Sequence, residues 1–454
     1  MPPPLIEPRT LKGFRDYAPA LMIPRERVLQ TARTVYRSFG FAPMDTPALE
    51  YAEVLLGKGG EESDKLVYRF RDHGDRDVAL RFDLTVPFAR FAAQYVPQLG
   101  TPFKRYAMGP VWRGERPQAG RYREFWQCDF DTIGTTSNAA DIEVALVIHD
   151  LMTALGVGDF QIRVNNRLVL NGLLEELGIA AHSTAVLRCL DKLGKVSADE
   201  VAAEMVQKAG VTGEQARRVL ALASLEGSND DILNQLGRDF GTNAKAAEGI
   251  GKLRELLAAT RTAGIREDAI RLDLSIARGL DYYTGTIFET FLLGSHPTAD
   301  GEKPRASYGS VCSGGRYDNL AGLYTKQTLP GVGASLGLDR LLGILEASKV
   351  LPKVSTPAPV LIVQFLADRV GDYQRLARIL RAAGLGAEVY PDPVKVGKQF
   401  QYASDRGFGV AIVAGSAEFE RGEWKVKNLT TRNEVAVPES GVVEAVRAAM
   451  GSSV

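Results

Sequence analysis

The chain has 454 residues, and at about 150 residues per domain this length predicts about three folded units. Hydrophobic residues make up 45% and charged residues 24%, which excludes a largely disordered, collagen-like or coiled-coil protein. Lys and Arg number 55, as do Asp and Glu, so the net charge gives no sign of nucleic-acid binding, although it does not exclude a local basic groove.

Local patterns in the sequence disfavour a membrane protein and a metal-binding protein. No run of about 18 apolar residues is present, and the first residues lack the charged leader and apolar stretch of a secretory signal. We therefore expect a cytoplasmic protein with no membrane partner. The 3 cysteines lie far apart in the sequence and the 4 histidines do not fall at metal-ligand spacing. Neither a disulfide framework nor a protein-bound metal is expected.

The first part of the chain predicts a mixed α+β domain. Residues 24–39 carry apolar side chains at helical spacing and are followed by Gly40, which predicts an amphipathic helix with a glycine stop. Short apolar runs then alternate with Arg-rich turns up to about residue 165, as in residues 78–83 and 106–113. This alternation and the aromatic content predict strands.

Residues 166–265 are different in character and predict helices. They are rich in Ala, Leu, Glu and Lys, and they contain capping boxes at Ser197 with Glu200 and at Thr212 with Gln215. Strand-like segments return over residues 266–346. We therefore expect a helical insertion at 166–265 that splits one domain, formed by residues 1–165 and 266–346.

A second domain is predicted after a proline-punctuated stretch. Residues 347–358 contain two prolines, are followed directly by Pro359 and lack hydrophobic periodicity, which is typical of a linker. Residues 359–454 alternate apolar strand-like runs with helical spacing. This pattern predicts a small α/β domain with a largely parallel sheet.

Residues 111–131 form the first candidate site. They predict two strands joined by a loop with Pro and Gly, in which Arg113 and Arg121 can hold an anion and Phe125 offers a stacking face. Planar guanidinium groups suit phosphate and an aromatic face suits a purine, so the segment favours a nucleotide. A solvated basic hairpin is the alternative.

Glycine-rich segments form the second and third candidates. Residues 274–285 and 313–318 combine glycines with tyrosines and aspartates, which suits a small polar ligand, although tight turns with core tyrosines would give the same pattern. In residues 331–342 a glycine-rich strand runs into a helix whose first turn carries Arg340, and this can seat a phosphate. No P-loop or dinucleotide-binding motif is present.

Together these segments resemble the class II aminoacyl-tRNA synthetases. Residues 39–50 resemble the first class motif, which forms much of the dimer interface. Residues 113–125 resemble the second motif, and residues 331–342 the third. The resemblance implies an α+β catalytic domain built on an antiparallel sheet with a helical insertion, a C-terminal α/β anticodon-binding domain, and a homodimer.

Two further segments narrow the resemblance to the histidyl-tRNA synthetase family. Residues 278–283 and 313–318 are similar to its two histidine-specific signatures, and the resemblance covers nearly the whole chain. It implies that L-histidine and ATP form histidyl-adenylate and pyrophosphate, after which histidine passes to the 3′ end of tRNA(His). The catalytic positive charges would be those of Arg113, Arg278 and Arg340, since guanidinium groups stabilise the charge that develops on the phosphate oxygens.

The ATP site follows from the same resemblance. It assigns ATP binding to Arg113, Glu115, Arg121, Phe125 and Arg340. Phe125 and the backbone near Glu115 would hold adenine, and Arg113 the α-phosphate. Arg121 and Arg340 would bind the terminal phosphates. Mg²⁺ would be bound through the phosphates of ATP and not by a metal site of the protein.

The resemblance also assigns the residues that bind the amino acid and the tRNA. Those for histidine are Asp83, Leu84, Thr85, Gln127, Asp131, Tyr282, Tyr283 and Tyr317. The first four would hold the α-amino group, and an ammonium does call for a carboxylate and neutral acceptors. Asp131 and Tyr283 would face the imidazole nitrogens, with the other two tyrosines lining the pocket. Arg116 and Gln118 would approach the acceptor end of the tRNA.

Two alternatives stay open within this fold. The first is a catalytically silent relative that serves as the regulatory subunit of ATP phosphoribosyltransferase. It is disfavoured by the histidine signatures, by Arg278 and by the complete C-terminal domain. The second is another class II synthetase, such as the prolyl or threonyl enzyme. Residues 278–283 disfavour both the prolyl and the threonyl enzyme, and a threonyl enzyme would also need zinc ligands.

Overall fold

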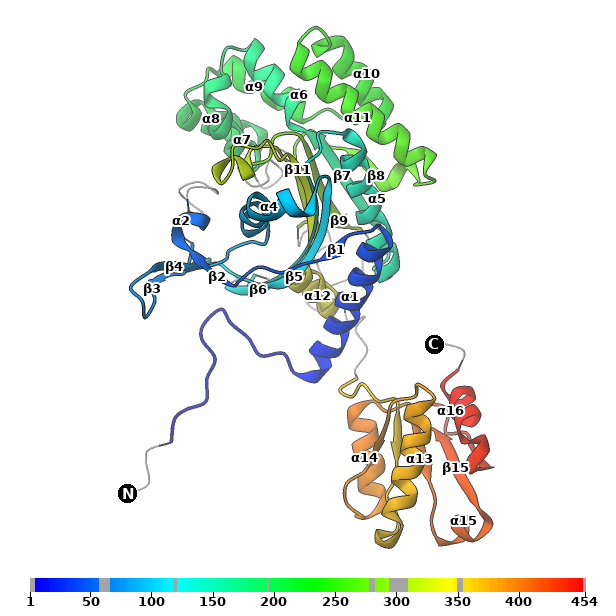
Figure 1. Ribbon diagram of the computed structural model, residues 1–454. Helices are drawn as coiled ribbons and strands as arrows, with labels where there is room; N and C mark the ends of the chain where they lie inside the picture. Colours follow the sequence, from blue (N-terminus) through cyan, green and yellow to red (C-terminus); the bar gives the residue numbers. More distant parts are fainter. Residues whose placement is uncertain are drawn as a thin grey trace. The chain divides into compact units, whose positions relative to one another are not determined.

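The computed structural model describes residues 5–56, 66–116, 121–193, 196–276, 282–293, 309–348 and 354–451. The chain divides into two units, one of Met1–Arg15 with Val28–Val350 and one of Asp16–Arg27 with Leu351–Val454 (Figure 1). No helix in the described ranges combines the length and the apolar character that a membrane crossing requires.

An eight-stranded sheet is the centre of the first unit. Its strands, in spatial order, are β1 (Ala42–Pro43), β5 (Phe103–Trp112), β6 (Glu124–Ile133), β11 (Gly331–Gly337), β10 (Cys312–Tyr317), β9 (Thr286–Leu292), β7 (Phe160–Asn166) and β8 (Ile270–Leu272). All pairs are antiparallel except the two at the edges, β1 with β5 and β7 with β8. The predicted antiparallel sheet is confirmed. Because β6 pairs with β11, the second and third class motifs lie side by side although about 200 residues separate them.

Different helices cover the two faces of this sheet. Even-numbered residues of β6, such as Cys128 and Phe130, share a hydrophobic core with α1 (Pro19–Ser38), α5 (Asn138–Leu155) and α12 (Leu338–Ala347). Odd-numbered residues point to the opposite face, as side chains alternate along a strand. There Ile133 packs with α4 (Thr85–Leu99). A three-stranded sheet of β2 (Leu49–Tyr51), β4 (Asp77–Leu80) and β3 (Arg69–Arg71), together with α2 (Ala52–Leu55), also belongs to this unit.

The described residues of the predicted helical region form helices joined by short turns, after Asn166 at the end of β7. Its helices are α6 (Arg167–Glu176), η1 (Ala180–His182), α7 (Ser183–Leu190), α8 (Ala198–Ala209), α9 (Gly213–Ala223), α10 (Asn229–Phe240) and α11 (Ala244–Thr262). Both predicted capping boxes are confirmed, at Ser197 and at Thr212. The apolar side chains of these helices join the same core as the central sheet, so the region is not a separate hydrophobic unit.

The second unit contains a five-stranded sheet. The strands are β13 (Ala387–Val389), β12 (Val360–Ile362), β14 (Val410–Val413), β15 (Glu423–Asn428) and β16 (Glu434–Pro438), and the helices are α13 (Val370–Ala382), α14 (Val396–Arg406), α15 (Ser416–Arg421) and α16 (Val442–Met450). The sheet is mixed, not largely parallel, since β15 is antiparallel to both neighbours. For β15 and β16 the physical reason is the short turn between them, where Asn428 Oδ1 accepts hydrogen bonds from the backbone N–H groups of Thr430 and Thr431.

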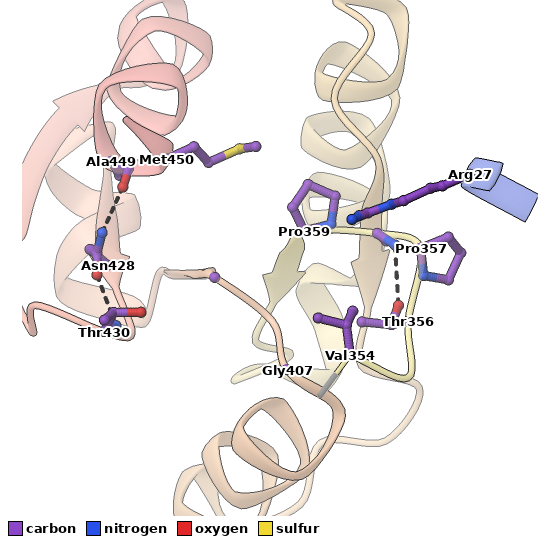
Figure 2. A pocket seen from close by; sticks show the side chains of 12 residues that line it. Arg27, Val354, Thr356, Pro357, Pro359, Gly407, Asn428, Thr430, Ala449 and Met450 are labelled. Atoms are coloured by element: carbon purple, nitrogen blue, oxygen red, sulfur yellow. Dashed lines mark hydrogen bonds between the residues drawn. The ribbon is translucent and has the colours of Figure 1, made fainter. Parts of the chain in front are cut away.

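The end of the predicted linker packs against this second unit. The backbone N–H of Ser355 donates to the carbonyl of Arg406 at 3.0 Å, and Thr356 is buried. Figure 2 shows the pocket beside this segment, which Asn428 and Met450 also line. Residues 349–353 of the predicted linker lie outside the described residues.

Candidate active site

A row of polar side chains on β6 forms the base of the site. Gln127, Asp129 and Asp131 are two residues apart, so they share the face of the sheet that α4 covers. Glycines on the neighbouring strand make room for them. A Cβ on Gly333, which is the register partner of Asp131 on β11, would lie 2.3 Å from the Oδ1 of Asp131. Only glycine fits at this position of the strand.

Three predicted tyrosines gather around this row. The hydroxyl of Tyr317 donates to Asp131 Oδ1 at 2.8 Å. The ring of Tyr282 lies 5.9 Å from that of Tyr317 and 5.2 Å from that of Tyr283, between centroids. Burial raises the pKa of Tyr282 and of Tyr283, so both hydroxyls stay protonated and can donate hydrogen bonds.

The start of α4 brings in the predicted residues Asp83, Leu84 and Thr85. Asp83 is buried and its Oδ1 accepts a hydrogen bond from the N–H of Val86 at 3.0 Å, so it caps the helix. Its Oδ2 accepts a hydrogen bond from the hydroxyl of Tyr282 at 3.4 Å. Thr85 Oγ1 lies 3.4 Å from Asp129 Oδ2. The structure therefore brings all the predicted histidine-binding residues to one place.

Arg105 on β5 belongs to the site and was not predicted. Its side chain is fully buried, with Nη2 at 2.7 Å from Asp131 Oδ2 and 3.9 Å from Asp129 Oδ2. It also donates to the carbonyl of Leu84 at 3.0 Å, and its guanidinium lies 4.4 Å from the ring centroid of Phe88. One buried positive charge thus links strand β6 to the start of α4.

Asp129 was also missed, although the sequence held a signal for it. It lies between two predicted residues at strand spacing, so Gln127 and Asp131 together imply that Asp129 shares their face. For Arg105 the signal is weaker. Its register partner on β6 is Asp131, but this pairing is known only from the sheet.

Several buried polar atoms of the described residues find no hydrogen-bond partner here. They are Arg105 Nε and Nη1, Gln127 Oε1 and Asp129 Oδ1, whereas Asp131 Oδ2 is held by its ion pair with Arg105. Burial raises the pKa of Asp129 to about 7, against the lowering effect of Arg105, and burial also raises that of Asp131. Because buried donors and acceptors are nearly always paired in native proteins, this cluster suits a small ligand rich in polar groups.

A second cluster, at the other end of β6, is positively charged. The guanidinium of Arg113 lies 5.0 Å from the ring centroid of Phe125, and its Nε donates to the carbonyl of Phe82 at 2.9 Å. Arg121 forms an ion pair with Glu115 at 3.5 Å. Burial lowers the pKa of Arg340, and the charges of Arg121 and Arg113 lower it further. Converging guanidinium groups repel one another, and a polyphosphate would relieve that repulsion.

A buried hydrogen bond sets the position of Arg340. The carboxylate of Asp339, at the start of α12, accepts from the backbone N–H of Trp126 on β6 at 2.8 Å. This contact joins the third class motif to the second. All five predicted ATP-binding residues therefore lie at this end of the sheet.

Two predicted residues cannot be placed. Arg278 and Gln118 lie outside the described residues, whereas Arg116 is described and exposed. Within the described ranges, no three His, Cys, Asp or Glu side chains gather as a metal site.

Comparison with known proteins identifies the family. A family model described as histidyl-tRNA synthetase matches residues 13–341, and one described as anticodon binding domain matches residues 360–449. The chain belongs to the histidyl-tRNA synthetase family. It is therefore a class II aminoacyl-tRNA synthetase, as its antiparallel sheet and motif order predicted.

Relatives of this synthetase match along almost its whole length. The histidine–tRNA ligase of Rhodopirellula baltica is 56% identical over 98% of this chain and 100% of that protein. That of Wolinella succinogenes is 43% identical over 94% of both chains. The crystal structure of histidyl-tRNA synthetase from Nostoc sp. PCC 7120 superposes with a TM-score of 0.87 at 33% identity, covering 97% of this chain and 99% of that one.

A regulatory relative is more distant. A structure from Bacillus halodurans, described as an ATP phosphoribosyltransferase regulatory subunit/histidyl-tRNA synthetase, has a TM-score of 0.70 at 21% identity, covering 88% of this chain and 97% of that one. At that identity it shows the fold alone. The regulatory alternative is therefore not favoured.

Proposed function

We infer that the chain is a histidine–tRNA ligase and that the two clusters along β6 are the two halves of its active site. The enzyme activates L-histidine with ATP, releases pyrophosphate, and transfers histidine from the adenylate to the 3′ end of tRNA(His). The observation that carries this assignment is the set of unpaired buried polar atoms around Asp129 and Asp131, which lies beside a cluster of arginines. The unpaired polar atoms suit an amino acid, and the arginine cluster suits a polyphosphate.

The amino-acid half would select histidine through buried hydrogen bonds. Asp131 and Tyr283 would face the two imidazole nitrogens, with Tyr282 and Tyr317 closing the pocket. Arg105 supports this role, because its contact at 2.7 Å keeps the buried carboxylate of Asp131 in one orientation. An amino acid without the imidazole would leave these groups unpaired, which can reject it by roughly 10⁴ to 10⁵.

The main-chain end of the substrate would lie toward the middle of β6. Asp83, Leu84, Thr85 and Gln127 are the residues proposed to hold the α-amino group. The contact of Thr85 with the polar row of β6 supports this placement. It leaves the carboxylate of the substrate directed toward the arginine cluster.

The half of the site that contains the arginine cluster would bind ATP and stabilise the negative charge that develops during the reaction. Arg113 would contact the α-phosphate, Arg121 and Arg340 the terminal phosphates, and Phe125 with the backbone near Glu115 the adenine. Attack of the histidine carboxylate on the α-phosphorus develops negative charge on the phosphate oxygens, which fixed guanidinium groups stabilise. Arg278 would supply a second charge there. Mg²⁺ bound to the phosphates of ATP would neutralise part of their charge.

The remaining parts of the chain are proposed to serve the tRNA. The second unit would bind the anticodon, which the match of residues 360–449 supports. Arg116 and Gln118 would approach the acceptor end, and the helical insertion at 166–265 would contact the acceptor stem. Homodimerisation would use residues 39–50, where the exposed strand β1 forms an edge of the main sheet. With ATP and tRNA as substrates, the enzyme would work in the cytoplasm.

Amino-acid-dependent exchange between ATP and pyrophosphate tests this assignment. Across all twenty amino acids we expect exchange with histidine alone, and Arg278→Ala should lower the rate by about 10² to 10³. Arg116→Ala should spare exchange and reduce tRNA charging. An absence of exchange with every amino acid would contradict the assignment and favour the regulatory alternative.

A further inference from the structure

The helical insertion begins with an arginine that contacts the backbone of Tyr283. This residue, Arg167, is the first of helix α6 and follows strand β7 directly. Arg167 is buried, and its Nη1 donates a hydrogen bond to the carbonyl of Tyr283 at 2.7 Å. Its backbone N–H donates to the carbonyl of Gly285 at 2.9 Å. The start of the insertion therefore holds the segment around Tyr283 at two points.

The two residues before Arg167 contact neighbouring parts of the same segment. Asn166 is fully buried, its side chain caps α6, and its Nδ2 donates to Thr286 Oγ1 at 3.3 Å. Asn165 Nδ2 donates to the carbonyl of Ile276 at 3.1 Å. Three successive residues thus form hydrogen bonds with the chain before and after the first histidine-specific signature.

One peptide group, between Tyr283 and Thr284, is held at both of its polar atoms. Its carbonyl accepts from the guanidinium of Arg167, and its N–H donates to the carbonyl of Arg316 on β10 at 2.8 Å. Thr284 Oγ1 also donates to Asp318 Oδ2 at 2.6 Å. Because a peptide group is planar, two hydrogen bonds on its opposite sides fix its orientation, and with it the direction in which Tyr283 leaves the backbone.

The ring of Tyr283 has little space in which to shift. A Cβ on Gly315 of β10 would lie 3.1 Å from Cδ1 of this ring, and the ring of Tyr282 lies 5.2 Å away between centroids. Burial raises the pKa of Tyr283, and the nearby charge of Arg167 acts to lower it. A rotation of the peptide group would therefore displace a tightly packed hydroxyl that is proposed to face imidazole.

Helix α6 is itself firmly held within the insertion. A Cβ on Gly172 of α6 would lie 2.8 Å from the Cβ of Ala246 on α11, and one on Gly249 of α11 would lie 3.0 Å from the backbone nitrogen of Val169. The two helices therefore pack with their backbones close together. Arg167 thus reaches Tyr283 from a rigid helix, which is what a positioning role requires.

We propose that Arg167 is a positioning residue for the selection of histidine, because it holds the peptide group that sets the direction of Tyr283. This inference rests on the proposed function. It gives the helical insertion a part in the choice of the amino acid, in addition to the contact with the acceptor stem proposed above. A lysine at this position keeps the charge and one donor, whereas a methionine keeps neither.

Histidine-dependent exchange between ATP and pyrophosphate, measured on the full-length enzyme, tests the proposal. Arg167→Met should raise the KM for histidine about 10- to 100-fold and leave the KM for ATP within about twofold of wild type. Arg167→Lys should recover part of the loss. Arg163→Met is the matched control, since Arg163 lies on β7 and pairs with Asp273 at 2.9 Å, and it should leave both KM values unchanged.

A double-mutant cycle shows whether Arg167 acts through Tyr283. Tyr283→Phe removes the hydroxyl proposed to contact imidazole, so adding Arg167→Met to it should raise the KM for histidine little further. If the two effects multiplied, or if Arg167→Met left the KM for histidine unchanged, the proposal would be overturned.

General damage to the enzyme has a different signature. Equal rises in the KM for histidine and in the KM for ATP would overturn the proposal, because they would show a loss of structure and not of positioning. If Arg167→Met does not fold, the selective rise in the KM for histidine is required of Arg167→Lys. A wild-type enzyme without histidine-dependent exchange would contradict the proposed function itself.

Discussion

Replacing Arg105 with methionine removes the only positive charge that lies against Asp129 and Asp131 among the residues that the structure describes. The guanidinium lies 2.7 Å from one carboxylate and 3.9 Å from the other, and it is fully buried. Methionine has a similar length and can pack on Phe88. The substitution therefore tests charge and hydrogen bonding more than volume.

The expected cost can be estimated from burial. Removing one partner of a buried ion pair leaves an uncompensated charge and typically costs about 3–5 kcal/mol of unfolding free energy. Arg105 lowers the pKa of both aspartates, so without it both pKa values rise further. A carboxyl group whose pKa is raised in the folded state binds more protons folded than unfolded, and stability then falls as pH rises. Because Asp129 already titrates at about pH 7 in the wild type, the extra cost of the variant should grow above that pH.

Two measurements check this reasoning. Urea unfolding of wild type and Arg105→Met at pH 6 and at pH 8 should show the larger difference at pH 8. Histidine-dependent pyrophosphate exchange should show a KM for histidine raised at least tenfold, with KM for ATP close to wild type. Arg69→Met is the matched control, since Arg69 forms an exposed ion pair with Asp77 and should leave both properties unchanged. If Arg105→Met were as stable as the wild type at pH 8, or if its KM for histidine were unchanged, the argument would be refuted.

Two further substitutions test the architecture of the site. Gly333→Ala places a Cβ 2.3 Å from the carboxylate of Asp131 and should raise the KM for histidine and destabilise the fold by about 1–3 kcal/mol, whereas Gly371→Ala, with nothing within 4 Å, should do neither in the same assays. Arg316→Met breaks a buried ion pair with Asp141 and should lower the unfolding free energy by about 3–5 kcal/mol, seen as an earlier urea midpoint. A variant at Arg316 as stable as wild type would contradict the structural role of that pair.

Local patterns in the sequence predicted the local structure well. The helix before Gly40 was predicted at residues 24–39 and is observed at Pro19–Ser38. Both capping boxes form as predicted, because they depend only on residues three apart. The sheet of the second unit was predicted less well, since the turn between β15 and β16 was not recognised as a hairpin.

Motif matching residue by residue predicted a set of site residues that the structure brings close together, and their roles stay predictions. The structure brings Asp83, Gln127, Asp131 and Tyr317 together, as the family resemblance implied. Arg105 was missed because an arginine within an apolar run is typical of an exposed strand position or of a turn. Its burial depends on a partner 26 residues later, and no local pattern encodes that partner.

The sequence by itself thus determined the family and the class of secondary structure in each region, and it supplied the residues proposed for the two half-sites. Hydrophobic period, capping residues and motif spacing are all local, so the linear order of residues expresses them directly. The tertiary structure alone decided which strands pair and in which register. Pairing of β6 with β5 and β11 sets Arg105, Asp129 and Gly333 around one carboxylate. The charge balance of that pocket depends on distances between strands far apart in the chain, and those distances exist only once the sheet has formed.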